Sequence, residues 1–423
     1  MVPSWEIRDR LGSQWSYNLA GKTSNAGWVY RREILTKLQE MGVHHLRSYL
    51  LPRSSYVNVN GVQVKLQSAW MIDSPTYFHR WLEEMASKGM HFTFQLGRPY
   101  SPSVPARTPP GDYHPWWGTP QGLIDAARHY GPNCVAGEAP NEYDEPKVSY
   151  DIIDPWDQTL RDWLRRVGPL WEQTFGAGTP YLGPSFGNAE QGTPSQLGDV
   201  SSYTDRKNAH PYCGNKVYRT ASLDRDYSLL QVTNPGQPMW ATEFGVAVTP
   251  TPPPYWAPAT ERDQGLLLSK QYLTMLKWGV RRSYLFNFYD ARASSQPFSL
   301  LLGDPTNGFY ERPAYRMFRK ILSLCDSSGG GTAPPAPTLS LSGAPADLKT
   351  LIAWNKDGTY LLFLWREAAL GTSPVRLSLS MPGKGLKCSY DLVSGGANCP
   401  KAQPSGTTQT IWIGDEPLAY KFG

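Results

Sequence analysis

The chain has 423 residues, of which 40% are apolar and 18% are charged, and its formal net charge is +5. This length suits a large domain followed by a small one. The mild charge includes no basic run of the kind that binds nucleic acids, and no apolar stretch is long enough to span a membrane. We therefore expect neither a nucleic-acid partner nor a membrane span.

Strand and helix patterns alternate along the first 325 residues. Apolar runs predict strands at 14–20 (or the loop that follows the first strand), 43–51, 90–96, 134–136, 179–186, 207–212, 238–248 and 282–289. Periodic apolar residues predict helices at 29–41, 78–85, 123–130, 160–170, 268–275 and 315–324. This alternation indicates a parallel α/β domain, and residues 1–325 are about as long as a (β/α)8 TIM barrel.

A composition break follows the barrel region. Residues 326–337, DSSGGGTAPPAP, have the composition of a linker. Beyond them, short apolar runs predict strands at 351–354, 360–365, 375–379, 409–413 and 418–422. Residues 338–423 are therefore expected to form a small all-β sandwich.

The five cysteines show no metal-ligand pattern, and we expect no metal or other cofactor. Cys388 and Cys399 lie in a loop-rich region and could close a small disulfide loop. The first residues lack the apolar core of a signal peptide. We expect a secreted or extracytoplasmic monomer whose signal peptide is absent from this sequence.

Two strand ends carry acidic residues of interest. The segment VAGEAPNEYD (135–144) ends an apolar strand in a turn that contains the adjacent pair Asn141 and Glu142. About a hundred residues later, PMWATEFGVAV (238–248) places Glu243 at the end of another strand. Glycoside hydrolysis by two carboxyl groups needs two acids on neighbouring elements, one to donate a proton and one to attack the anomeric carbon.

With the motifs NEY and TEFG, the chain resembles glycoside hydrolase clan A over roughly residues 15–324, and is similar to families 5 and 39. The resemblance implies a retaining enzyme on a (β/α)8 barrel, with its glutamates at the ends of the fourth and seventh strands. Glu142 would then be the acid/base and Glu243 the nucleophile. Retention predicts carboxyl groups roughly 5–5.5 Å apart, against roughly 6.5–9.5 Å for inversion.

The same resemblance suggests residues that bind substrate or support the two glutamates. Asn141 would hold the hydroxyl next to the reacting carbon, and Arg47, at the end of the second strand, would support the nucleophile. His210 and Tyr212, in KNAHPY, match positions beside the substrate. Further candidates at strand ends are Gln95, Asn287 and Tyr289.

Loops rich in proline and aromatic residues favour a long substrate. The loop 99–120 carries Trp116 and Trp117, and the loop 249–258 carries Trp256. Proline stiffens loops, and aromatic rings offer flat faces to sugars. An Asn60-Gly61 hairpin is predicted after the second strand. Together with the glutamate pair, these loops predict an endo-acting glycosidase of an oligosaccharide or polysaccharide.

Other interpretations stay open. Glu138, Asp144 and Glu145 flank Glu142 and compete with it, and Glu138 in particular could face the substrate in its place. The enzyme could act from chain ends as an exo-glycosidase, or the barrel could bind glycans without catalysis. A metal-dependent hydrolase on a barrel would need clustered histidines, and seven scattered His residues give no HxH motif. The role of the C-terminal module is expected to be structural.

Overall fold

The computed structural model describes residues 1–14, 29–54, 56–59, 62–65, 75–97, 118–145, 155–249, 256–290, 297–400 and 404–423. For residues 56–59, 62–65 and 75–77 it describes the backbone. No helix within these ranges is both long and apolar enough to cross a membrane.

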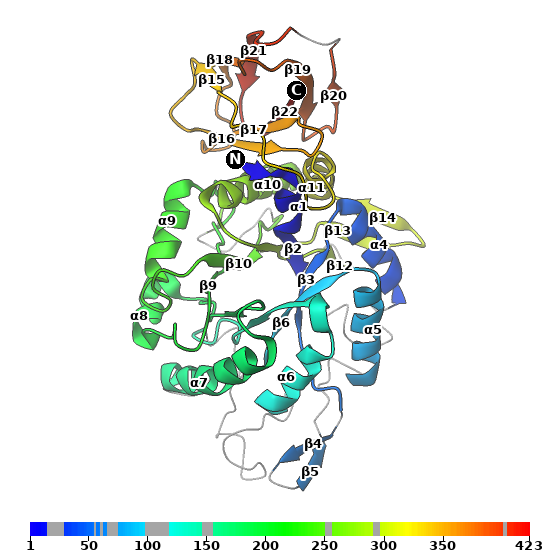
Figure 1. Ribbon diagram of the computed structural model, residues 1–423, viewed down its shortest axis with the longest axis vertical. Helices are drawn as coiled ribbons and strands as arrows, with labels where there is room; N and C mark the ends of the chain where they lie inside the picture. The colour runs from blue at the N-terminus through cyan, green and yellow to red at the C-terminus, as the bar shows by residue number, and fades with distance from the viewer. Residues whose placement is uncertain are drawn as a thin grey trace.

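Eight parallel strands form one sheet in the order β8-β7-β6-β3-β2-β11-β10-β9. The strands are β2 (Leu11–Gln14), β3 (His45–Tyr49), β6 (His91–Gln95), β7 (Cys134–Glu138), β8 (Tyr181–Leu182), β9 (Lys207–Ala209), β10 (Met239–Phe244) and β11 (Ser283–Leu285). The two edges meet where Leu182 of β8 pairs with Arg206, just before β9. The predicted (β/α)8 barrel is confirmed, with β7 as its fourth strand and β10 as its seventh (Figure 1).

Helices surround this sheet (Figure 1). They are α1 (Ser4–Asp9), α4 (Arg31–Met41), α5 (Pro75–Ser87), α6 (Pro120–Arg128), α7 (Trp156–Phe175), α8 (Thr193–Leu197), α9 (Thr220–Leu229), α10 (Glu261–Trp278) and α11 (Pro313–Ser323), with 3-10 turns η1 (Gly131–Asn133) and η2 (Ala189–Gln191). As predicted, α4 buries Ile34, Leu38 and Met41 and ends at Gly42, whose φ of 96° is readily adopted by glycine.

Short strands extend the loops after three barrel strands. The hairpin predicted after β3 is present as β4 (Tyr56–Val59) and β5 (Val62–Lys65), and its turn lies outside the described residues. Beyond β11, the strands β12 (Tyr289–Asp290), β13 (Leu301–Asp304) and β14 (Gly308–Glu311) form a three-stranded sheet. In the loop after β10, Thr249 forms an isolated bridge with Ala259.

The first barrel strand ends where the predicted segment 14–20 begins, which agrees with the interpretation of that segment as the loop after the strand. The strand is Leu11–Gln14, which overlaps the predicted 14–20 at one residue, and 15–28 lie outside the described residues. Its sequence, LGSQ, contains one large apolar residue, so hydropathy gives little signal. Gly12 is needed there because a Cβ would lie 2.4 Å from the ring of Tyr284. That ring joins Ala136, Leu182 and Trp240 in a buried cluster.

The C-terminal region forms two mainly antiparallel sheets built as a sandwich. One sheet has the order β1-β16-β17-β22-β19-β20 and the other β15-β18-β21. Their strands are β1 (Val2–Pro3), β15 (Ser340–Ser342), β16 (Leu348–Trp354), β17 (Tyr360–Arg366), β18 (Val375–Ser380), β19 (Leu386–Asp391), β20 (Ala397–Asn398), β21 (Gln409–Ile413) and β22 (Leu418–Phe422). The N-terminal β1 pairs in parallel with β16 and so ties the start of the chain to this module. Cys388 and Cys399 form the predicted disulfide.

Helix α10 is buried on all sides. The sequence predicts one apolar face with Leu268, Tyr272 and Met275, but every residue from 264 to 276 is buried. The reason is tertiary, because β16 and β17 of the module pack on the side of α10 that faces away from the barrel (Figure 1). Residues 324–339, which include the predicted linker, form no helix or strand.

Candidate active site

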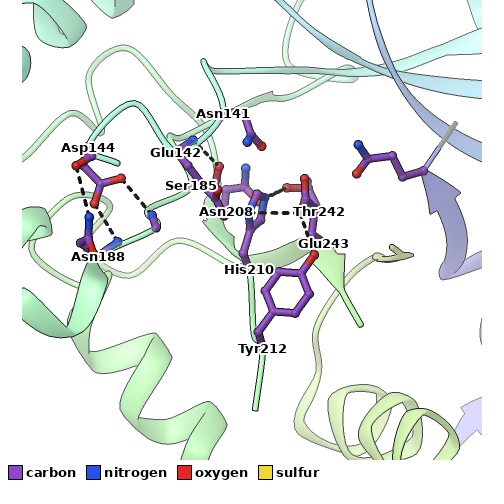
Figure 2. Close-up of polar contacts among 12 residues, drawn as sticks. Asn141, Glu142, Asp144, Ser185, Asn188, Asn208, His210, Tyr212, Thr242 and Glu243 are labelled. Carbon is purple, nitrogen blue, oxygen red and sulfur yellow. Dashed lines mark hydrogen bonds and ion pairs between the residues drawn. The ribbon is translucent and has the colours of Figure 1, made fainter. Parts of the chain in front are cut away.

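Polar side chains gather where the barrel strands end at their carboxyl termini. Asn141 and Glu142 follow β7 by a few residues, Glu243 lies in β10, and His210 follows β9 (Figure 2). The pairing of β10 with β11 shifts register between Ala241 and Phe244. Such an irregularity re-aims side chains near a strand end, and here both Thr242 and Glu243 reach the site.

Arg47 of β3 is the centre of this polar cluster. It is 2% exposed. Its Nε and Nη2 donate to the two carboxylate oxygens of Glu138 at 2.6 and 2.8 Å. Its remaining N–H groups donate to Gln14, to Asn141 and to the carboxylate of Glu243. All five guanidinium hydrogens therefore have acceptors, and the side chain joins four strands or the loops that follow them.

Glu138 does not face the cavity. It is 0% exposed. Besides Arg47, its Oε1 accepts hydrogen bonds from Asn208 Nδ2 at 3.0 Å and from Thr242 Oγ1 at 2.8 Å. All these partners of Glu138 belong to the protein. Its carboxylate therefore compensates the charge of Arg47 and holds the guanidinium group in place. The alternative in which Glu138 meets the substrate is therefore not supported by the geometry.

Glu243 is a buried carboxylate held in its ionised form. Its Oε2 accepts a hydrogen bond from the Tyr212 hydroxyl at 2.8 Å, and Arg47 pairs with its Oε1. Burial by itself raises the pKa of Glu243, but the positive charges of His210 and Arg47 and the Tyr212 hydroxyl outweigh it, so this pKa lies below its ordinary value. An ionised carboxylate is the form that can attack an electrophile.

Glu142 sits in a turn and contacts His210. Its φ is 42°, a conformation uncommon outside glycine, and its N–H donates to Ser185 Oγ at 3.3 Å. Its Oε1 lies 2.7 Å from His210 Nδ1, while His210 Nε2 lies 3.0 Å from Thr242 Oγ1. Because the Thr242 hydrogen has two acceptors, Glu138 and Asn208, the Thr242 oxygen accepts from His210 Nε2–H.

This arrangement favours a charged imidazole. Burial lowers the pKa of His210, but the carboxylates of Glu243 and Glu142 outweigh that effect and raise it. One proton therefore lies between His210 Nδ1 and Glu142. The pair can hold it on the imidazole, or on the carboxyl group with a neutral imidazole as acceptor.

The two candidate carboxylates are close together. One oxygen each of Glu142 and Glu243 and a ring nitrogen of His210 lie within 4.8 Å of one another. The two carboxyl groups therefore face the same small volume, and the separation of roughly 5–5.5 Å expected for a retaining pair stays a prediction. The same three residues could hold a cation, but Arg47 already compensates the charge of Glu243. We assign no metal to them.

Asn208 and Thr242 contribute to the site and were not among the sequence predictions, whereas Asp144 was considered there only as an acid that competes with Glu142. Thr242 directly precedes Glu243, and Asn208 lies two residues before His210. Each is a hydrogen-bonding residue near the end of a predicted strand, and that position could have identified it as a site residue. Asp144 accepts hydrogen bonds from the N–H groups of Gly187 and Asn188 at 2.9 and 3.0 Å (Figure 2). It thereby ties the turn of Glu142 to the loop after β8.

The remaining predicted residues are placed as follows. Gln95 is buried at the end of β6, and its Nε2 has no partner among the described residues. Asn287 accepts from the N–H of Phe288 at 2.8 Å, and the Tyr289 hydroxyl donates to the carbonyl of Gly303 at 2.7 Å, so both support the backbone. Their roles in substrate binding stay predictions.

Of the three predicted tryptophans, Trp256 lies within the described residues. Trp256 packs edge-on against Phe298 at 5.5 Å and lies 6.2 Å from the ring of Tyr212, so it supports the residue that contacts Glu243. Trp116 and Trp117 lie outside the described residues.

A hollow of about 650 Å³ opens beside the site. Glu142, His210 and Tyr212 line it, together with the loop after β8 and one side of α9. Its size suits a small-molecule ligand.

No protein-family model matches the sequence, and a sequence search of characterised proteins finds no match either. By structure, the chain is similar to a family 39 glycoside hydrolase from Bacteroides cellulosilyticus, with a TM-score of 0.61 and 14% identity over 99% of this chain and 82% of that one.

It is also similar to a glucosidase from Croceicoccus marinus, with a TM-score of 0.61 and 11% identity over 100% of this chain and 95% of that one. A family 51 α-L-arabinofuranosidase from Bifidobacterium longum gives a TM-score of 0.54 and 12% identity over 100% and 97% of the two chains. At these identities the likeness shows a shared fold, a barrel with a C-terminal all-β region.

Proposed function

We propose that this protein is a retaining glycoside hydrolase that cleaves an oligosaccharide or polysaccharide by double displacement. The observation that carries the proposal is the pair of carboxylates, Glu142 and Glu243, within 4.8 Å at the open end of the barrel. Their environments differ in the way the two roles require. Glu243 is held ionised by two cations and a hydroxyl, whereas Glu142 contacts no cation among the described residues other than His210, whose Nδ1 lies 2.7 Å from its Oε1.

In the first step, a carboxylate oxygen of Glu243 forms a bond to the anomeric carbon as the glycosidic carbon–oxygen bond breaks. The departing oxygen takes a proton from Glu142. Arg47 and Tyr212 orient Glu243 through their hydrogen bonds. The product is a sugar ester of Glu243 and a free leaving group.

In the second step, Glu142 takes a proton from a water molecule, which attacks the anomeric carbon and displaces Glu243. Each step inverts the configuration of the anomeric carbon, so the two steps together retain it. His210 suits both steps because it can accept a hydrogen bond from the Glu142 acid or donate one to the carboxylate. Asn141, whose Oδ1 is held by Arg47 at 2.6 Å, can present its amide N–H groups to a sugar hydroxyl.

Endo action is part of the proposal. The hollow beside Glu142 adjoins a second, larger one, and the two share Gly187, Glu190, Tyr212 and Arg225. A groove that continues beyond the reacting centre suits a chain of sugars better than a single terminal unit. We also propose an extracytoplasmic location, because the Cys388–Cys399 disulfide is typical of oxidising compartments.

The test is to incubate the enzyme with a panel of glycans and follow the products. An early NMR spectrum should show the substrate's own anomeric configuration, and an inverted anomer would contradict the mechanism. Mass profiles should show internal fragments first. Release of single units from one end, with no internal cleavage, would favour the exo-glycosidase instead. Binding of glycans without hydrolysis of any would favour a non-catalytic barrel.

A further inference from the structure

The larger hollow beside the active site has a volume of about 1030 Å³. Because it shares Tyr212 and Arg225 with the hollow that Glu142 lines, the two form one groove. Glu142 is the residue that would protonate the departing oxygen. A groove that begins at the proton donor can hold the leaving-group part of a substrate.

Besides the loop after β8, α9 and α10, three further parts of the chain line the larger hollow. They are the loop after β9 (residues 212–219), the segment 256–258 after β10, and Ala369 and Leu370 of the C-terminal module. The module thus reaches the groove, although its strands β16 and β17 pack on α10.

Buried hydrogen bonds hold these walls in place. The Asn215 side chain donates to the carbonyls of Ala247 and Ala257, both at 2.8 Å, and accepts from the Ala247 N–H at 2.9 Å. Glu367 accepts from the N–H and the hydroxyl of Thr220 at 2.8 and 2.6 Å, which ties the module to the start of α9. A groove fixed in this way is pre-organised, so less ordering entropy is lost on binding.

The charges along the groove do not cancel. Arg225 pairs with Glu190 at 2.9 Å and with Asp226 at 3.2 Å. Asp263 accepts hydrogen bonds from Thr260 at the start of α10.

Lys216 and Arg219 also line the larger hollow, and their side chains have no ion pair with any described residue. The lining of the larger hollow therefore carries three cations, Lys216, Arg219 and Arg225, against two carboxylates, Glu190 and Asp263. A neutral chain would leave Lys216 and Arg219 without partners, whereas an acidic one would pair with them.

We propose that the groove binds the leaving-group part of an acidic glycan, whose carboxylate or sulfate groups pair with Lys216 and Arg219. This inference rests on the proposed function and narrows its substrate class to anionic chains. It also gives the C-terminal module a part in substrate binding, through the wall that Ala369 and Leu370 form.

The test measures binding to the Glu142→Gln variant, so that turnover does not interfere. The probes are oligogalacturonides, sulfated carrageenan oligosaccharides and neutral manno-oligosaccharides of equal length, titrated by calorimetry at low and high salt. Either acidic probe should bind more tightly than the neutral one, and its affinity should fall with salt because exposed charges are screened. The two acidic probes distinguish carboxylate from sulfate.

Adding Lys216→Ser and Arg219→Ser should weaken the acidic probe about tenfold more than the neutral one. The matched control adds Lys88→Ser and Arg376→Ser, which remove two exposed cations away from the groove, and should have no such effect.

Equal affinity and salt dependence for acidic and neutral probes would overturn the inference. So would equal losses in the two double variants, or an oligonucleotide that binds as tightly as the acidic sugars. These outcomes are separate from a failure of the proposed function, which would show as no hydrolysis of any glycan by the unmodified enzyme.

Discussion

At the open end of the barrel, the buried Arg47 has an acceptor for each of its N–H groups. In α10, Lys270 is 1% exposed, and its Nζ has no hydrogen-bond partner among the described residues. Ser269 Oγ and Gln271 Oε1 on the same helix also lack partners there.

The buried cation has hydrogen-bond acceptors at the open end of the barrel, whereas the one in α10 has none in the part of the chain that the structure describes, so the two regions are expected to contribute differently to the protein. At the open end, the buried Arg47 holds the carboxylates of Glu138 and Glu243 in fixed positions. A fixed carboxylate is what a reaction at this site requires. On α10, Lys270 is buried with no hydrogen-bond partner among the described residues, and such a group lowers the stability of the packing around it. We therefore expect changes at the open end to act mainly on turnover, and changes on α10 to act mainly on stability.

The largest expected effect is on turnover. Glu142→Gln and Glu243→Gln should each lower the rate by about 10³-fold or more, because each removes a group that takes part in bond making or proton transfer. The melting temperature should not fall, since the amide keeps the shape of the side chain. Glu172→Gln, at an exposed position on α7, is the control. Hydrolysis near the unmodified rate in either site variant would refute the assignment.

Arg47→Met is expected to be an exception at the open end, because it should lower stability as well as turnover. It leaves Glu138 buried without its counter-charge, which costs about 3–5 kcal/mol of unfolding free energy. Chemical denaturation measures this loss. Adding Glu138→Gln should recover part of it, because the unpaired charge is then gone. An unchanged denaturation midpoint in Arg47→Met would show that the cluster is not important for stability.

Lys270→Met should sharpen the contrast by raising stability about 1–3 kcal/mol at neutral pH while leaving turnover unchanged. Burial lowers the pKa of Lys270 to about 8. Between about pH 8 and the ordinary value of 10.5, the unfolded chain binds this proton and the folded chain does not, so stability of the unmodified protein rises with pH.

The advantage of Lys270→Met should therefore shrink above about pH 8, as thermal unfolding across pH will show. The control is Lys277→Met on the same helix, where the lysine donates to the carbonyl of Thr350 at 3.0 Å. That change should give no gain. A lower melting temperature in Lys270→Met would mean that the lysine has a stabilising partner.

The smallest expected effect is a pH dependence at the open end. The pKa of His210 is raised in the folded protein, so its contribution to stability is full below its ordinary value near 6.5 and is lost as pH rises through the folded pKa. The melting temperature of His210→Gln should thus differ from that of the unmodified protein more at acid than at alkaline pH. A constant difference would mean that His210 does not gain a proton on folding.

The sequence by itself determined the elements and the chemistry that they carry. Apolar periodicity located α4, α5, α6, α7, α10 and α11 but not α1, α8 and α9. Gly42 marked the end of α4 because few other residues adopt its backbone conformation. The motifs around Glu142 and Glu243 lie at the ends of the fourth and seventh strands, as the resemblance implied. The Cys388–Cys399 pair was also visible, because the two cysteines lie close together in the chain.

The tertiary structure alone decided which acid faces the cavity and which faces of the helices are covered. Glu138 and Glu142 are four residues apart in one acidic segment, and Arg47, from a distant strand, takes the first into the interior. The burial of α10 on all sides depends on strands that lie far along the chain. Lys216 and Leu370 likewise line one groove only after folding. Local patterns report which side of a segment is apolar, whereas contacts between distant segments depend on how the whole chain packs.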